Sequence, residues 1–82
     1  MDKLRNRIDE LDAKLLKLLN ERAECVQKIW KIKQRKNIEV FIPEREVKLL
    51  HRLSSLNKGP MSEDMVRHLF KEIIDTLKEL QK

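Results

Sequence analysis

The fold is decided by residues 4–33, which read LRNRIDELDAKLLKLLNERAECVQKIWKIK. The stretch contains no Pro or Gly, and most of its residues are Leu, Lys, Glu and Arg, which favour helix. Apolar side chains recur at alternating steps of four and three, the pattern of a helix with one apolar seam. The seam consists of Leu4, Ile8, Leu11, Leu15, Leu18, Cys25, Ile29 and Ile32. We therefore predict a single long helix.

This helix is too long for a compact monomer. At a rise of about 1.5 Å per residue it measures roughly 45 Å. A compact chain of 82 residues has a radius of gyration of only about 12 Å. The helix should therefore project from its own chain and expose its seam, and we expect a second chain to cover it.

One charged residue interrupts the seam. The stepping runs from Leu18 to Arg22 and then to Cys25, so a guanidinium lies where an apolar side chain is expected. Burying a guanidinium is costly unless an anion lies against it. That anion could be a carboxylate of the protein itself or part of a bound ligand, and the spacing alone favours neither.

The composition predicts one small all-α domain over residues 1–82. Hydrophobic and charged residues each make up 40% of the chain, with one Gly and two Pro, which is typical of helices with short connections. A core of this size favours oligomerisation. The single Cys25 has no disulfide partner, and we expect it to be a small buried residue in a reducing compartment. No secretory signal or membrane-length apolar run is present, so a cytoplasmic protein without membrane contact is expected.

Two shorter helices are predicted after the long one. The first helix should end near Lys36, and residues 37–42 should form a loop. Pro43 favours a helix start, and the second helix should end before Gly59, whose left-handed conformation and following Pro60 stop it. Its expected apolar face is Val47, Leu50, Leu53 and Leu56.

The third helix is expected to begin at a cap and to run almost to the C-terminus. Ser62 is a suitable N-cap, and the acidic residues Glu63 and Asp64 suit the first turn. The expected apolar stripe is Val66, Leu69, Phe70, Ile73, Leu77 and Leu80.

Common catalytic and metal-binding patterns are absent from the sequence. It has no Gly-rich phosphate loop, and His51 and His68 are too far apart for a local metal motif. We expect both histidines on solvated flanks and expect no metal or cofactor. The net charge of +5 suggests a nucleic-acid module as one alternative, but only one Trp and two Phe are available for stacking. We therefore expect no nucleic-acid partner.

Three cations of the long helix have a spacing that constrains any shared ligand. Arg22 and Lys33 lie within about 20° of each other around the helix and about 16 Å apart along it, so both face one side. Arg5 lies about 25 Å from Arg22 and is rotated by about 100°. Arg5 cannot reach the same small ligand within its chain, but a second, antiparallel copy of the helix could bring it there.

The chain resembles the all-helical chorismate mutases. The similarity lies in LRNRIDELDAKLLKLLNER at 4–22, KIK at 31–33, PERE at 43–46, and LFKEII at 69–74 followed by Gln81. It covers essentially the whole chain, and the conjunction of blocks is highly specific. The resemblance implies an intertwined homodimer of three-helix chains with one long, one short and one medium helix. It also implies rearrangement of chorismate to prephenate in phenylalanine and tyrosine biosynthesis, without a cofactor.

The resemblance assigns roles to individual residues of this chain. Arg22 of one chain and Arg5 of the other would bind the substrate carboxylates. Lys33 and Gln81 would donate hydrogen bonds to the ether oxygen of the breaking bond. These residue types suit a pericyclic reaction, which needs a dianion held in its reactive conformation and stabilisation of charge on that oxygen.

The second helix would contribute two further residues, and two positions depart from the family. Glu46 would accept a hydrogen bond from the substrate hydroxyl, and Arg45 would line the pocket. A family serine that helps to hold a carboxylate is replaced by Leu77, with Thr76 beside it. A frequent acidic residue before the second helix is replaced by Ile42.

The sequence is also compatible with two alternative functions. An isochorismate pyruvate lyase of the same fold would bind a similar dianion, so the charge of the pocket does not separate the two enzymes. A helical interaction or nucleic-acid-binding module would bind phosphates through the basic run at 28–36 with strong salt dependence. That module leaves Arg22 in the seam unexplained.

Overall fold

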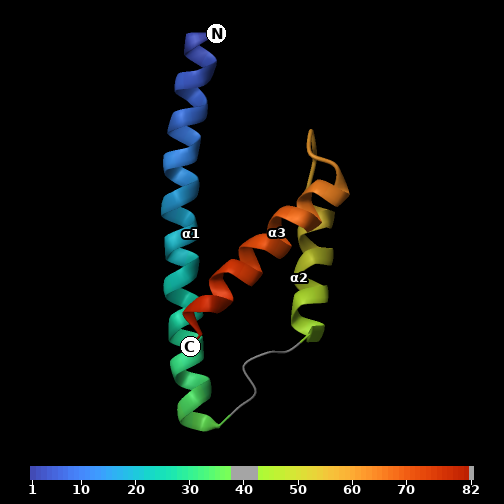
Figure 1. Cartoon of the computed structure of the whole chain (residues 1–82). Coiled ribbons are helices and arrows are strands. Elements are labelled where there is room, and N and C mark those ends of the chain that lie inside the picture. Colours follow the sequence, from blue (N-terminus) through green and yellow to red (C-terminus); the bar gives the residue numbers. More distant parts are fainter. Residues whose placement is uncertain (38–42, 82) are drawn as a thin grey trace.

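The chain forms three α-helices and a short final turn, shown in Figure 1 as a computed structural model that describes residues 1–37 and 43–81. The elements are α1 (Asp2–Lys36), α2 (Pro43–Leu56), α3 (Glu63–Leu77) and the 3-10 turn η1 (Lys78–Leu80). The described residues include no strand. The predicted all-α arrangement of one long and two shorter helices is confirmed.

The long helix begins two residues before its predicted start at Leu4 and ends at Lys36, which confirms the predicted end. It is capped by Asn37, which adopts a left-handed conformation with φ 54° and ψ 42° and donates its backbone N–H to the carbonyl of Gln34. Lys33, Arg35 and Lys36 occupy the last turn, where cations interact favourably with the helix dipole. The loop predicted for 37–42 lies outside the described residues except for Asn37.

The molecule is extended because α1 projects from the other helices. Its dimensions are 52 × 24 × 16 Å and its radius of gyration is 15.4 Å, against about 12 Å for a compact chain of this length. In Figure 1 the C-terminal end of α3 meets the second half of α1, while the first half of α1 lies apart from α2 and α3.

The single chain buries little apolar surface. Among the described residues only Val66 and Ile74, both on α3, are buried. The seam of α1 is exposed from Leu4 to Leu18, and Cys25 is exposed as well. The expectation that Cys25 is buried is therefore wrong for the isolated chain, since none of the described elements covers that side of α1.

The ends of α2 and α3 follow local signals. Ser62 Oγ accepts the backbone N–H of Met65 at 3.1 Å, which confirms the predicted N-cap. Asn57 stabilises the connecting turn by donating its side-chain amide to the carbonyl of Met61 at 2.8 Å and accepting the N–H of Gly59 at 3.1 Å. Gly59 has φ 80°, in the left-handed region as predicted.

Two predicted apolar faces are partly wrong. On α2, Val47 and Leu56 are exposed, because α3 packs against the side that carries Leu49, Leu50 and Leu53. On α3, the residues that are buried differ in part from the predicted apolar stripe. Its member Leu69 is exposed, Ile74 is buried instead, and the last predicted turn is the 3-10 turn η1 rather than α-helix. No helix of the described residues is long and apolar enough to cross a membrane.

Candidate functional site

One face of α1 meets the C-terminal turn of the chain. Apart from the adjacent pair Arg22 and Ala23, the half-buried residues of α1 are spaced by three and four, so they form a single stripe, and η1 contacts α1. They are Leu19, Arg22, Ala23, Val26, Trp30 and Lys33. Arg22 and Lys33 therefore share a face, as the sequence predicts, and this face lies toward the end of α3.

Arg22 is half-buried and has no acidic partner within the described residues. Arg22 takes part in none of the ion pairs among the described residues, which include those of Arg7, Arg67, Lys71 and Lys78. The interpretation of Arg22 as one half of an internal ion pair thus finds no support there. A half-buried guanidinium in this position is suited to an anionic ligand, because its planar fork matches a carboxylate.

Gln81 is brought to the same region by the 3-10 turn. It is half-buried and directly follows η1, and its backbone N–H donates to the carbonyl of Lys78 at 2.9 Å. Figure 1 shows the C-terminus beside the second half of α1, the half that carries Lys33. The C-terminal turn and the second half of α1, which are far apart in the sequence, therefore lie side by side.

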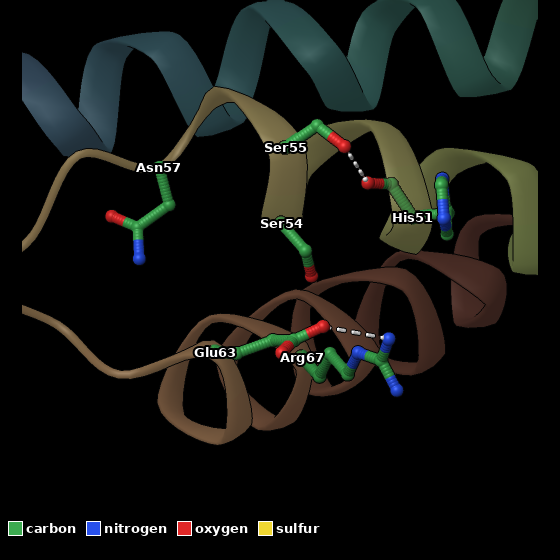
Figure 2. A pocket seen from close by; sticks show the side chains of 6 residues that line it. All are labelled: His51, Ser54, Ser55, Asn57, Glu63 and Arg67. Atoms are coloured by element: carbon green, nitrogen blue, oxygen red, sulfur yellow. Dashed lines mark hydrogen bonds and ion pairs between the residues drawn. The ribbon is translucent and has the colours of Figure 1, made fainter.

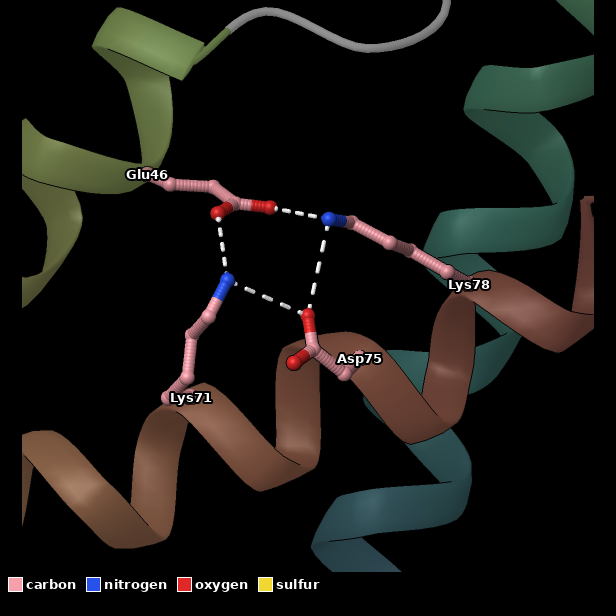
Figure 3. A network of polar contacts seen from close by, with 4 residues as sticks. All are labelled: Glu46, Lys71, Asp75 and Lys78. Atoms are coloured by element: carbon pink, nitrogen blue, oxygen red, sulfur yellow. Dashed lines mark hydrogen bonds and ion pairs between the residues drawn. The ribbon is translucent and has the colours of Figure 1, made fainter.

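Glu46 lies in a ring of four charged groups that joins α2 to α3 and η1 (Figure 3). Its Oε1 is 2.6 Å from Lys78 Nζ, and its Oε2 is 3.3 Å from Lys71 Nζ. Asp75 Oδ1 completes the ring at 3.3 Å from Lys71 Nζ and 3.5 Å from Lys78 Nζ. The side chain of Glu46 is only 16% exposed.

The ring keeps Glu46 ionised. The hydrogen bond from Lys78 is the largest influence and lowers the pKa of the Glu46 carboxyl, while desolvation acts in the opposite direction and is outweighed. The hydrogen bond to Glu46 in turn raises the pKa of Lys71. At neutral pH Glu46 is therefore a hydrogen-bond acceptor only, and two oxygens with about four lone-pair sites leave room for a further donor.

Sequence reasoning missed the two lysines that hold Glu46. The spacing of Lys71, Asp75 and Lys78 predicts ion pairs within a helix, and two such pairs are present. Nothing in the spacing indicates that both lysines also reach a carboxylate of α2.

The remaining predicted site residues, Arg5 and Arg45, are not part of the charged ring around Glu46. Arg5 is exposed on the projecting half of α1, on one uninterrupted helix with Arg22. Arg45 is exposed next to Glu46. Leu77 is half-buried and cannot donate a hydrogen bond, Thr76 is exposed, and Ile42 lies outside the described residues.

A separate hollow of about 320 Å³ lies between the end of α2 and the start of α3 (Figure 2). Its polar groups are largely engaged with each other: Arg67 pairs with Glu63 at 2.9 Å, and Ser55 donates to the carbonyl of His51 at 3.1 Å. His51 and His68 are exposed, as expected. The described residues contain no cluster of three potential metal ligands. The hollow shares no residue with the candidate site.

Comparison with known proteins identifies relatives along the whole chain. The chain is 35% identical over 80 residues to the chorismate mutase of Methanocaldococcus jannaschii, which covers 96% of this chain and 81% of that protein. It is 46% identical over 70 residues to the bifunctional chorismate mutase/prephenate dehydratase of Neisseria gonorrhoeae, which covers 85% of this chain and 19% of that protein. The chain therefore spans about a fifth of the length of this bifunctional relative.

The fold agrees with these relatives. A chorismate mutase structure from Thermus thermophilus (form II) superposes with a TM-score of 0.95 at 32% identity, covering 98% of this chain and 91% of that one. The sequence profile of the chorismate mutase type II family matches residues 4–82. This match over nearly the whole chain, with the shared three-helix architecture, shows that the chain belongs to the chorismate mutase type II family.

Proposed function

We propose that residues 1–82 form one catalytic domain that rearranges chorismate to prephenate, a step of aromatic amino-acid biosynthesis, as a cytoplasmic homodimer. The observation that carries the proposal is the half-buried Arg22, without an acidic partner among the described residues, on the α1 face that meets the turn leading to Gln81. Family membership supports the same substrate. The relative from M. jannaschii, named a chorismate mutase, is matched over most of its length.

The reaction requires the substrate to be held rather than attacked. A [3,3] rearrangement breaks an ether C–O bond and forms a C–C bond in one step, so it needs no nucleophile, general base or metal. Arg22, with Arg5 of the partner subunit, binds the two carboxylates and holds the flexible dianion in its reactive conformation. Positioning of this kind removes much of the entropic part of the barrier.

Charge stabilisation provides the second contribution. The ether oxygen gains negative charge in the transition state, and Lys33 and Gln81 donate hydrogen bonds to it. Glu46 accepts a hydrogen bond from the substrate hydroxyl and so fixes the ring, while Arg45 adds positive charge to the rim of the pocket. Because the donors act on charge that develops during the reaction, they stabilise the transition state more than the bound substrate.

The dimer completes both the core and the site. The projecting half of α1 exposes Leu4, Ile8, Leu11 and Leu15 in the single chain, and a second α1 packed antiparallel covers them and delivers its Arg5 to the region of Arg22. Equilibrium sedimentation at micromolar concentration should give the mass of a dimer. A stable monomer would contradict this assembly and the shared site.

The decisive experiment follows the absorbance of chorismate and identifies the product chromatographically. Chorismate should be converted to prephenate, and Arg22→Ala should abolish conversion while its helix content stays unchanged. Isochorismate is incubated in parallel. Release of pyruvate from isochorismate without conversion of chorismate would assign the chain to lyase chemistry, and turnover of neither would refute the proposal.

A further inference from the structure

The ring around Glu46 contains a lysine whose place in the fold suggests a role in the reaction. Lys78 is the first residue of η1, the turn that packs against the face of α1 with Arg22 and Lys33. Its ammonium group lies 2.6 Å from Glu46 Oε1. Figure 3 shows the side chain extending from the end of α3 toward Glu46 on α2, with α1 behind it.

We propose that Lys78 is a positioning residue that fixes the orientation and charge of Glu46 for its contact with the substrate hydroxyl. This inference rests on the proposed function, in which Glu46 accepts a hydrogen bond from that hydroxyl. A glutamate side chain has several rotatable bonds, and a short ion pair at one of its oxygens restricts them. The second oxygen then has a defined direction in which it can accept.

The two lysines of the ring are not equivalent. Lys78 is 35% exposed and makes the shorter contact, whereas Lys71 is 49% exposed and lies 3.3 Å from Glu46. Exposed ion pairs contribute little because water screens them. Both lysines also lie near Asp75, Lys71 at 3.3 Å and Lys78 at 3.5 Å, so this neighbour does not separate them. Lys78 should therefore have the larger effect on Glu46.

The charges around Glu46 decide how its titration should respond. Lys71 and Asp75 face it from α3 and Lys78 from η1. Its own helix carries the adjacent, exposed Arg45, and α1, which contacts η1, carries Arg22 and Lys33. In the wild type, Lys78 is the main group that lowers the pKa of the Glu46 carboxyl. Neutralising Lys78 removes this effect, so the pKa of Glu46 rises and Glu46 becomes protonated at a higher pH than in the wild type.

The test compares Lys78→Met, which keeps the length of the stem without the charge, with Lys78→Arg, which keeps the charge. We expect Lys78→Met to lower kcat/KM for chorismate about tenfold at neutral pH, the usual effect of losing a hydrogen bond to a charged group. The acid limb of its pH–rate profile should move to higher pH, and Lys78→Arg should restore the limb. Lys48→Met is the matched control, because it removes one exposed positive charge two residues from Glu46 without being part of the ring.

A double-mutant comparison separates positioning from simple stabilisation of the fold. If Lys78 acts through Glu46, Lys78→Met should have little further effect on kcat/KM in a Glu46→Gln background. A tenfold loss in that background, or an unmoved acid limb in Lys78→Met, would refute the role of Lys78 while leaving the mutase proposal intact. A wild-type chain without mutase activity would instead refute the proposed function and this role with it. Thermal unfolding of each variant verifies that the compared proteins are folded.

Discussion

The sharpest consequence of the proposed site is that each active site must draw its two arginines from different chains. Arg5 and Arg22 lie on one continuous helix, α1 (Asp2–Lys36). Seventeen residues at about 1.5 Å each place them roughly 25 Å apart, and they also point about 100° away from each other. No small dianion can contact both within one chain.

Dimers that combine one Arg5→Ala chain with one Arg22→Ala chain provide a quantitative test of this geometry. Arg5→Ala and Arg22→Ala homodimers should each lose at least about 100-fold in kcat/KM, because every site lacks one partner of a buried charge pair. When the two variants are unfolded together and refolded, random pairing makes about half of the dimers mixed. Each mixed dimer has one site without either arginine and one site with both. About a quarter of the wild-type activity should therefore return.

The assay is the decrease of chorismate absorbance, with mass spectrometry to quantify the mixed dimer. The control mixes Arg22→Ala with Lys33→Ala, two residues that the proposed site takes from the same chain. That mixture should show no recovery, because each site of the mixed dimer lacks one of the two. Activity that stays at background in the Arg5→Ala and Arg22→Ala mixture, after exchange is confirmed, would refute the shared site.

Further substitutions test the donors of the proposed site and the cap of α3. Lys33→Ala should lower kcat more than it raises KM, with a loss of about 3 kcal/mol in transition-state stabilisation as for other oxyanion donors; an unchanged kcat would remove it from the reaction. Gln81→Glu should be poorly active at neutral pH and recover toward acid pH, because a glutamate donates a hydrogen bond only when protonated, whereas full activity with a flat pH profile would place Gln81 outside the site. Ser62→Ala should lower the free energy of unfolding in urea by about 1 kcal/mol by removing the cap on Met65, and Ser55→Ala, whose hydroxyl only bonds back within α2, should cost clearly less at the same protein concentration.

Leu77, which departs from the family pattern, directly precedes Lys78 of the charged ring. The family resemblance places a carboxylate-binding serine at this position, and a leucine cannot provide that hydrogen bond. The next residue, Lys78, brings a cation to the same turn and contacts Glu46. The last residue of α3 thus lacks the polar group that the resemblance predicts, and the first residue of η1 carries a charge.

Much of the secondary structure was predictable because the signals that start and stop helices are local. Pro43 begins α2, Ser62 caps α3, and Gly59 takes the left-handed conformation between them. These effects act within about one turn of the helix, so neighbouring residues are sufficient to predict them. The shared face of Arg22 and Lys33 was also predictable, because the period of a regular helix carries an orientation over many residues.

The tertiary structure decided which faces pack and which charges meet. α2 carries apolar side chains on two sides, and only its packing with α3 selects Leu50 and Leu53 for partial burial while Val47 stays exposed. The contact between Glu46 and Lys78 joins residues on different helices, and its 2.6 Å distance depends on how α2 and α3 cross and on the 3-10 turn that ends α3. A sequence pattern describes the surface of each helix, but the relative placement of two helices arises from the fit of their side chains over the whole contact, so no single stretch specifies it.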